Sequence, residues 1–157
     1  MSEKLTEYTV QGWVNLNNFT DDFATFFGTA TDGRTWLGIN SDNHFEFRVY
    51  SGDKLYSTPI TNNSITAKLG VWYHIAATYS ETSDSMKLYV NGTLVSNETL
   101  FPSDSIGVAS SNNYMCRGEN GEYLNGTIDN IAVWNRELSA DEVRYVFQQP
   151  LGFEDFS

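Results

Sequence analysis

The feature that most constrains this chain is an alternation of apolar and polar residues with a period of two, which returns in short runs along its length. In residues 7–16 every second side chain apart from Gly12 is apolar, namely Tyr8, Val10, Val14 and Leu16. Successive side chains of an extended strand point to opposite faces. The run therefore predicts a strand with one buried face.

Further runs of this kind predict an almost wholly β protein. Asp32-Gly33 and Asn91-Gly92 are hairpin signals, because these residue types tolerate a positive φ. The expected apolar segments and strands are 23–30, 34–40, 44–50, 71–79, 86–91, 93–99, 105–110, which is the weakest, and 122–134. Many short strands at near-regular spacing indicate a sandwich or a jelly roll.

The strands on either side of the loop 41–43 predict a definite register. A regular hairpin would pair Asn40 with His44, Gly38 with Glu46, Trp36 with Arg48, and Arg34 with Tyr50. One face of this hairpin is then apolar, and the other carries aromatic and charged side chains.

One short helix is expected near the C-terminus. Ser139 and Glu142 have the spacing of a capping box, in which each side chain bonds the backbone N–H of the other residue. Val143, Val146 and Phe147 follow as an apolar stripe, and Pro150 stops the helix. The sequence thus predicts an all-β, two-sheet antiparallel sandwich with one short C-terminal helix, as a single domain over residues 1–157.

Composition narrows the function. The chain has 157 residues, 20 Asp+Glu against 9 Lys+Arg and a formal net charge of −11. This charge repels phosphate backbones and anionic lipids, so we expect neither nucleic acid binding nor membrane insertion. The single Cys116 has no partner for an internal disulfide, and no secretion signal is recognisable in the chain.

Four segments resemble laminin-G-like domains of the concanavalin A-like jelly-roll family. These are Tyr8 to Val14 with Trp13; Gly70 to Tyr79 with Trp72 and His74; Met86 to Val95 with Leu-Tyr-Val-Asn-Gly; and Leu124 to Ser139 with Trp134. The resemblance implies a concanavalin A-like jelly roll, with His74 as a scaffold residue and the three tryptophans mostly buried. It also implies an extracellular, cell-surface or virion location.

The chain departs from the family pattern at its start. Family members usually carry a strand before the first tryptophan strand, and only residues 1–6 precede it here. An unpaired edge in a sandwich invites a partner strand. The first strand is then missing, shortened, or supplied by the tail 151–157 or by another chain. We expect a terminus, for instance the tail 150–157 with Phe153 and Phe156, to pair with a neighbouring domain or subunit, which makes an oligomer one expected form.

The polar face of the 34–50 hairpin is the candidate ligand site. Sugars stack on exposed aromatic planes while planar polar groups pair their hydroxyls. The proposed platforms are Trp36 and Tyr50, and the proposed polar groups are Arg34, Asn40, Glu46 and Arg48. The alternative is structural: Trp36 with Arg48, and Arg34 with Tyr50, would be cross-strand cation-π pairs. Tyr56, Tyr114 and Tyr123 are further candidate exposed aromatics.

Asp129 is the candidate metal ligand. Its position often binds structural calcium in similar jelly rolls, and Asp21, Asp22 and Asp32 are the possible helpers. Calcium takes six to eight oxygen ligands, so Asp129 alone is insufficient. The equally weighted alternative is that its carboxylate accepts backbone hydrogen bonds at a bend.

The function expected from these features is non-catalytic recognition of a glycan or glycosylated surface, with calcium holding the loops. Paired carboxylates on one strand, as related glycan-cleaving jelly rolls use, are not recognisable here. The alternative is a virion decoration or fibre protein, or a surface-layer protein, in which the jelly roll serves assembly with neighbouring subunits. A glycan hydrolase or lyase is the remote alternative.

Overall fold

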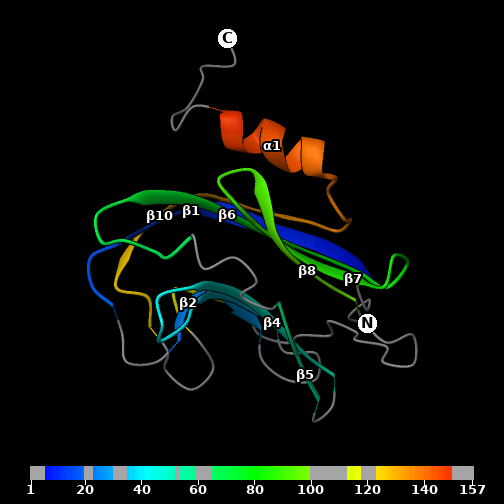
Figure 1. Cartoon of the computed structure of the whole chain (residues 1–157), viewed down its shortest axis with the longest axis horizontal. Coiled ribbons are helices and arrows are strands. Elements are labelled where there is room, and N and C mark those ends of the chain that lie inside the picture. Colours follow the sequence, from blue (N-terminus) through cyan, green and yellow to red (C-terminus); the bar gives the residue numbers. More distant parts are fainter. Residues whose placement is uncertain are drawn as a thin grey trace.

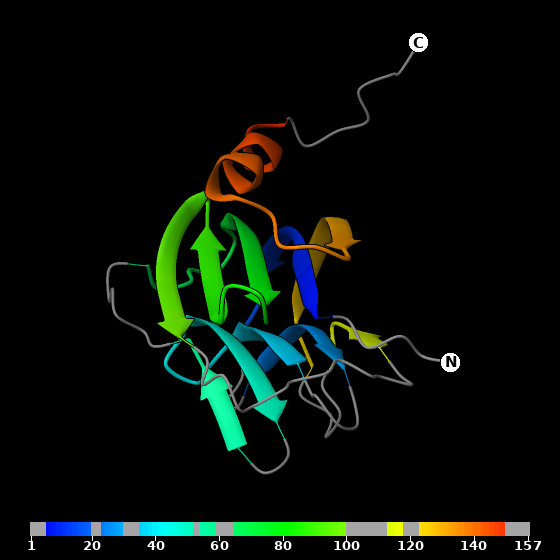
Figure 2. The same ribbon diagram turned by 90° about the vertical axis from the view of Figure 1, so that its right-hand side faces the viewer.

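A computed structural model describes residues 6–19, 23–29, 35–51, 54–58, 65–99, 113–117 and 123–149 of the chain. The described strands form two antiparallel five-stranded sheets that pack face to face. Figure 1 shows the two sheets as stacked layers, with one helix lying on the outer side of the upper sheet. Figure 2 shows the same order of layers from the side.

We call the sheet under the helix the helix-side sheet and the other the far sheet. The strands of the helix-side sheet are, in spatial order, β10 (Gly126–Trp134), β1 (Glu7–Leu16), β6 (Trp72–Ser80), β7 (Ser85–Val90) and β8 (Thr93–Thr99). Those of the far sheet are β5 (Lys54–Ser57), β4 (Phe45–Ser51), β3 (Thr35–Ile39), β2 (Ala24–Thr29) and β9 (Asn113–Met115). The helix is α1 (Ala140–Gln148).

The core lies between the sheets, and β1 contributes its alternate apolar residues to it, as predicted. Tyr8, Val10, Val14 and Leu16 are each at most 3 % exposed. The Tyr8 ring stacks on Tyr79 with centroids 5.2 Å apart, and its hydroxyl lies 2.8 Å from Thr35 Oγ1 in the far sheet. Burial raises the pKa of Tyr8, so this hydroxyl stays protonated and joins the two sheets.

The Asn91-Gly92 turn both closes a hairpin and seats the helix. Both residues have a positive φ, 50° and 73°, as a tight β-hairpin turn requires. A Cβ on Gly92 would lie 2.8 Å from the Phe147 ring, so the missing side chain leaves room for α1. Phe147 also packs against Trp13 and His74.

The predicted elements are largely confirmed. The Ser139 and Glu142 capping box is present, and the helix ends at Gln148, just before Pro150. The sequence did not predict β5 and β9, which have four and three residues. The expected strand 105–110, the first residues 1–5 and the tail 150–157 lie outside the described residues. No helix of the described part is long and apolar enough to span a membrane.

Candidate functional site

The outer face of the far sheet carries the predicted ligand residues. The register of β3 and β4 pairs Trp36 with Arg48 and Gly38 with Glu46, and the Asn40 N–H donates to the His44 carbonyl at 2.9 Å. The register predicted from the sequence is thus confirmed at these positions. Arg34 lies outside the described residues. We call the set Phe23, Trp36, Asn40, Glu46, Arg48 and Tyr50 the aromatic face.

Two glycines let aromatic rings lie flat on this sheet. A Cβ on Gly38 would come within 2.6 Å of the Phe23 ring and 2.2 Å of the Ala24 carbonyl. A Cβ on Gly28 would come within 3.0 Å of the Trp36 ring. The rings therefore occupy space that side chains at these positions would fill, and the aromatic layer is set by the backbone beneath it.

Trp36 lies deeper than a sugar platform should. Its side chain is packed between Phe23, with centroids 6.4 Å apart, and Tyr50, edge-on at 5.4 Å. Trp36 is only 8 % exposed, and its Nε1 is buried without a hydrogen-bond partner among the described residues. Tyr50 and Arg48 are half-buried. The accessible part of the aromatic face is thus Tyr50 and Arg48, and Trp36 supports them.

The polar residues of this face form one network. Arg48 donates to both carboxylate oxygens of Glu46, from Nε at 2.8 Å and from Nη2 at 3.0 Å, and Asn40 Nδ2 donates to Glu46 Oε2 at 3.1 Å. The guanidinium lies over the Phe23 ring, 4.4 Å from its centroid, rather than over Trp36. The predicted Trp36–Arg48 cation-π pair is therefore wrong, because the ion pair with Glu46 turns Arg48 along its own strand.

Asp129 lies at a β-bulge on β10, where the pairing with β1 shifts. Its Oδ1 accepts a hydrogen bond from the Asn130 N–H at 2.7 Å, and Asn130 has a φ of 48°. Asp129 is exposed, and no group of three or more His, Cys, Asp or Glu that could hold a metal occurs among the described residues. Asp21, Asp22 and Asp32 lie outside the described residues. The structure thus shows the bend that the alternative interpretation describes, and calcium binding stays a prediction.

Two expectations about other aromatic residues are wrong. Tyr56 is 5 % exposed, because its ring belongs to the core between the sheets. Trp72 begins β6 at the edge of the core and is 36 % exposed, whereas Trp13 and Trp134 are partly buried. Tyr123 is 59 % exposed, as expected.

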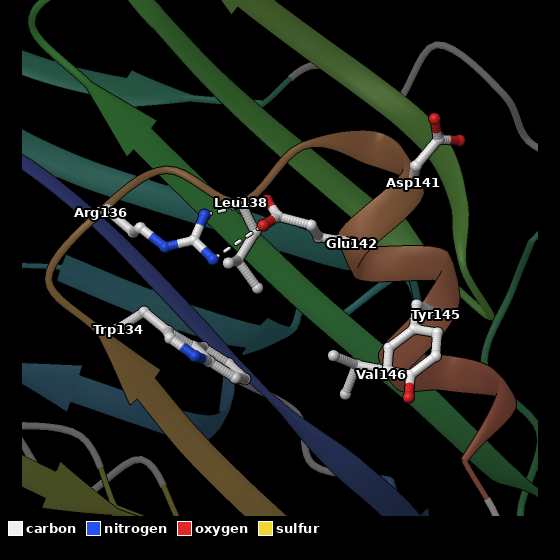
Figure 3. A pocket seen from close by; sticks show the side chains of 7 residues that line it. All are labelled: Trp134, Arg136, Leu138, Asp141, Glu142, Tyr145 and Val146. Carbon is white, nitrogen blue, oxygen red and sulfur yellow. Dashed lines mark hydrogen bonds and ion pairs between the residues drawn. The ribbon is translucent and has the colours of Figure 1, made fainter.

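A concave surface lies beside α1, on the other side of the sandwich from the aromatic face. It is a cleft of about 360 Å³ lined by Trp134, Arg136, Leu138, Asp141, Glu142, Tyr145 and Val146. Figure 3 shows Trp134 on one side and Tyr145 with Val146 on the helix opposite, with Arg136 and Glu142 meeting at one end. The Asp141 carboxylate points away from the cleft (Figure 3).

Family membership follows from a comparison with known domains. A model of the concanavalin A-like lectin/glucanases superfamily, laminin-G type, matches residues 2–144. The chain belongs to this superfamily. Its two-sheet sandwich and its scaffold tryptophan strands are those of a concanavalin A-like domain.

Solved structures agree with this fold at low sequence identity. The chain superimposes on domain 4 of AbnA, a GH43 extracellular arabinanase from Geobacillus stearothermophilus, in complex with arabinotriose, with a TM-score of 0.73 at 22 % identity, covering 91 % of this chain and 67 % of that one. A putative carbohydrate binding protein from Bacteroides ovatus gives 0.71 at 20 %, covering 90 % and 41 %. The heptameric SAP-like pentraxin from Limulus polyphemus gives 0.69 at 19 %, covering 92 % and 70 %. No curated protein matches the chain.

The sequence did not point to the cleft in this concanavalin A-like domain. Its residues come from the end of β10, the following connection and α1, so no single period groups them. One feature of the sequence could have indicated the polar end of the cleft. Glu142, the capping-box residue, lies six positions after Arg136, a residue of opposite charge. Tyr145 was a second signal, because it lies off the apolar stripe of the expected helix, and the structure leaves it 66 % exposed.

Proposed function

We propose that this domain is a non-catalytic carbohydrate-recognition module that binds an extracellular or cell-surface glycan on its aromatic face. The observation that carries the proposal is the joint placement of the half-buried Tyr50 and Arg48 on one outer sheet face, above the buried Trp36 ring. Membership of the superfamily and the carbohydrate-related structural neighbours support the ligand class.

The chemistry of the face suits a sugar. The half-buried Tyr50 ring offers an apolar plane for pyranose C–H groups. Arg48 Nη1 makes no hydrogen bond to any described residue, so it is available to a hydroxyl.

The same face is poorly suited to hydrolysis. Glycosidases of the usual kind need two carboxyl groups that flank the bond and exchange protons with the substrate. Glu46 is 7 % exposed, and both of its oxygens accept hydrogen bonds from Arg48 or Asn40. A carboxylate whose two oxygens are engaged in this way positions Arg48, which supports a binding role.

Calcium is part of the proposal as a structural ion that would hold the early loops against β10. Asp129 would supply one carboxylate and Asp21, Asp22 and Asp32 the others. This donor set matches the preference of calcium for carboxylate oxygens.

The test is a calorimetric titration of neutral oligosaccharides, arabinotriose among them, into the native chain and into Tyr50→Ala. We expect saturable binding that the variant weakens about threefold to tenfold, since one aromatic contact is removed. Tyr123→Ala is the matched control, because Tyr123 is an exposed tyrosine outside the aromatic face. Equal affinity of Tyr50→Ala and the native chain would remove the aromatic face from the proposal.

Assembly is a second candidate function, favoured by one observation. Three apolar side chains within four consecutive residues are exposed: Leu69 (44 %), Val71 (40 %) and Trp72 (36 %). Adjacent exposed apolar side chains are typical of contact surfaces. Sedimentation of the native chain and of Val71→Ser separates the candidates: a native oligomer that the variant dissociates supports assembly, and a native monomer argues against it.

A further inference from the structure

The cleft beside α1 has apolar walls on two different elements. Trp134 lies partly buried at the end of β10, packed against the small cluster of Ala76, Tyr89, Leu138 and Val143. On the other wall Tyr145 is 66 % exposed, whereas Val143 of the same helix is fully buried. The helix therefore docks through Val143 and leaves the Tyr145 ring at the mouth of the cleft (Figure 3).

One end of the cleft combines donors with an acceptor. Arg136 Nη1 donates to Glu142 Oε2 at 2.9 Å, and Arg136 Nη2 donates to Glu142 Oε1 at 2.7 Å. Glu142 Oε1 accepts no other hydrogen bond from the described residues, and Arg136 Nε donates none. A hydroxyl group both donates and accepts, so it fits a guanidinium beside a carboxylate better than a purely anionic or cationic group does.

The charges around the cleft select against anions. Arg136 and Glu142 contribute one charge of each sign, the Asp141 carboxylate lies 3.8 Å from Arg144, and the whole chain carries −11. The positive charge of Arg136 is already neutralised by Glu142. A carboxylated or sulfated sugar would therefore be repelled, whereas an uncharged one would not.

Hydrogen bonds to β1 and to the first turn of α1 hold the polar end of the cleft. Thr9 Oγ1 donates to the Arg136 carbonyl at 2.9 Å and accepts from the Leu138 N–H at 2.9 Å, and Thr9 is fully buried in β1. Glu142 also accepts from the Ser139 N–H at 2.8 Å, which ties Arg136 to the first turn of α1. A rigid site loses little conformational freedom on binding.

We infer that this cleft binds an uncharged pyranose unit, which stacks on the exposed Tyr145 ring opposite Trp134 and pairs its hydroxyls with Arg136 and Glu142. The inference rests on the proposed function for the class of ligand only. The cleft lies on the outer side of the helix-side sheet, whereas the aromatic face is the outer side of the far sheet, so the two sites are on opposite faces of the sandwich (Figure 1). A volume of about 360 Å³ suits one or two sugar units.

The experiment is a nitrogen-15 NMR titration of the full chain, read at the indole N–H signals of its four tryptophans. Single Trp→Phe variants assign the Trp134 signal, which reports on the cleft, and the Trp36 signal, which reports on the aromatic face. The probes are the methyl glycosides of glucose, galactose, mannose and N-acetylglucosamine, each up to about 50 mM, which covers millimolar dissociation constants. Methyl glucuronide is the anionic counterpart of methyl glucoside.

We expect at least one neutral glycoside to shift the Trp134 signal saturably, and methyl glucuronide not to shift it. Tyr145→Ala should weaken this binding about threefold to tenfold with an unchanged Tm, because Tyr145 is exposed. Tyr123→Ala, at a similarly exposed tyrosine, should leave the binding unchanged.

Three results would overturn the inference: no shift at Trp134 with any probe, binding that survives Tyr145→Ala unaltered, or equal binding of methyl glucuronide. The experiment tests the cleft and the aromatic face independently of each other. A shift at Trp36 alone would remove the cleft and keep the proposed function on the aromatic face. A shift at Trp134 alone would uphold the cleft and argue against the aromatic face.

Discussion

Arg136 and Glu142 form a two-pronged ion pair across the connection between β10 and α1, with N–O distances of 2.9 and 2.7 Å. Glu142 is also the N3 residue of the helix capping box. One carboxylate therefore fixes both the start of the helix and the polar end of the cleft. This relationship makes the docking of the helix dependent on pH.

Glu142 should make the stability of the fold depend on pH in the acid range. Hydrogen bonds from Arg136 and from the Ser139 N–H lower the pKa of Glu142 from its ordinary value of 4.5 to about 2. A carboxyl group whose pKa is lower in the folded than in the unfolded chain stabilises the fold at pH values above its unfolded-state pKa. This contribution is lost as the pH falls from 4.5 through 2. At pH 6 the native chain should have a higher Tm than the Glu142→Gln variant. The two Tm values should converge as the pH approaches the folded-state pKa of Glu142, about 2. A constant difference at every pH would contradict the account.

Thr9 gives a second prediction, about the wall of the cleft. Thr9→Val removes the acceptor for the Leu138 N–H and should destabilise the fold by about 1–3 kcal/mol, because a buried N–H is left unpaired. Thr78→Val is the matched control: Thr78 is fully buried, and its Oγ1 has no partner among the described residues. The control should change the free energy of unfolding in urea little. Equal losses in both variants would show that the Thr9 bonds are unimportant.

His74 should make the free energy of unfolding depend on pH just below neutrality. It is fully buried beneath Trp13 and Phe147, its Nε2 lies 2.6 Å from Gln11 Oε1, and burial lowers its pKa to about 4 from 6.5. The unfolded chain takes up the proton first, so stability present above pH 6.5 is lost as the pH falls toward 4. Between pH 7 and pH 5 the loss should be about 2 kcal/mol.

Urea unfolding of the native chain and of His74→Gln over this pH range measures the effect. His74→Gln should remove most of the pH slope. A slope that persists without His74 would assign the proton uptake to another group.

The sequence predicted what depends on local pattern. The alternation in β1, the Asn91-Gly92 turn and the Ser139–Glu142 box each act within a few residues, and all appear in the structure. The register of β3 with β4 also followed, because a short hairpin loop determines which residues face each other.

What depends on distant packing was not predictable in the same way. The period of β3 places Trp36 on the outer face, but Phe23 and Tyr50 decide that it is buried there. The ion pair with Glu46, two residues along β4, draws Arg48 away from Trp36 and over Phe23. The cleft joins a strand end to a helix, so only the three-dimensional arrangement brings Trp134 and Tyr145 to one surface.

The calcium prediction is tested by melting. An ion held by Asp129 stabilises only the folded chain, so Tm should rise with calcium and fall with a chelator. Asp129→Asn would abolish this response while it keeps the hydrogen bond to the Asn130 N–H. A Tm that is independent of calcium would assign Asp129 to the β-bulge alone.

Carbohydrate recognition is tested most directly by a glycan array of the native chain, read with calcium and again with chelator. We predict selective binding to a family of neutral glycans, weakened in both Tyr50→Ala and Tyr145→Ala and retained in Tyr123→Ala. No binding to any glycan under either condition would contradict carbohydrate recognition and leave assembly through the exposed Leu69, Val71 and Trp72 as the function that the structure supports.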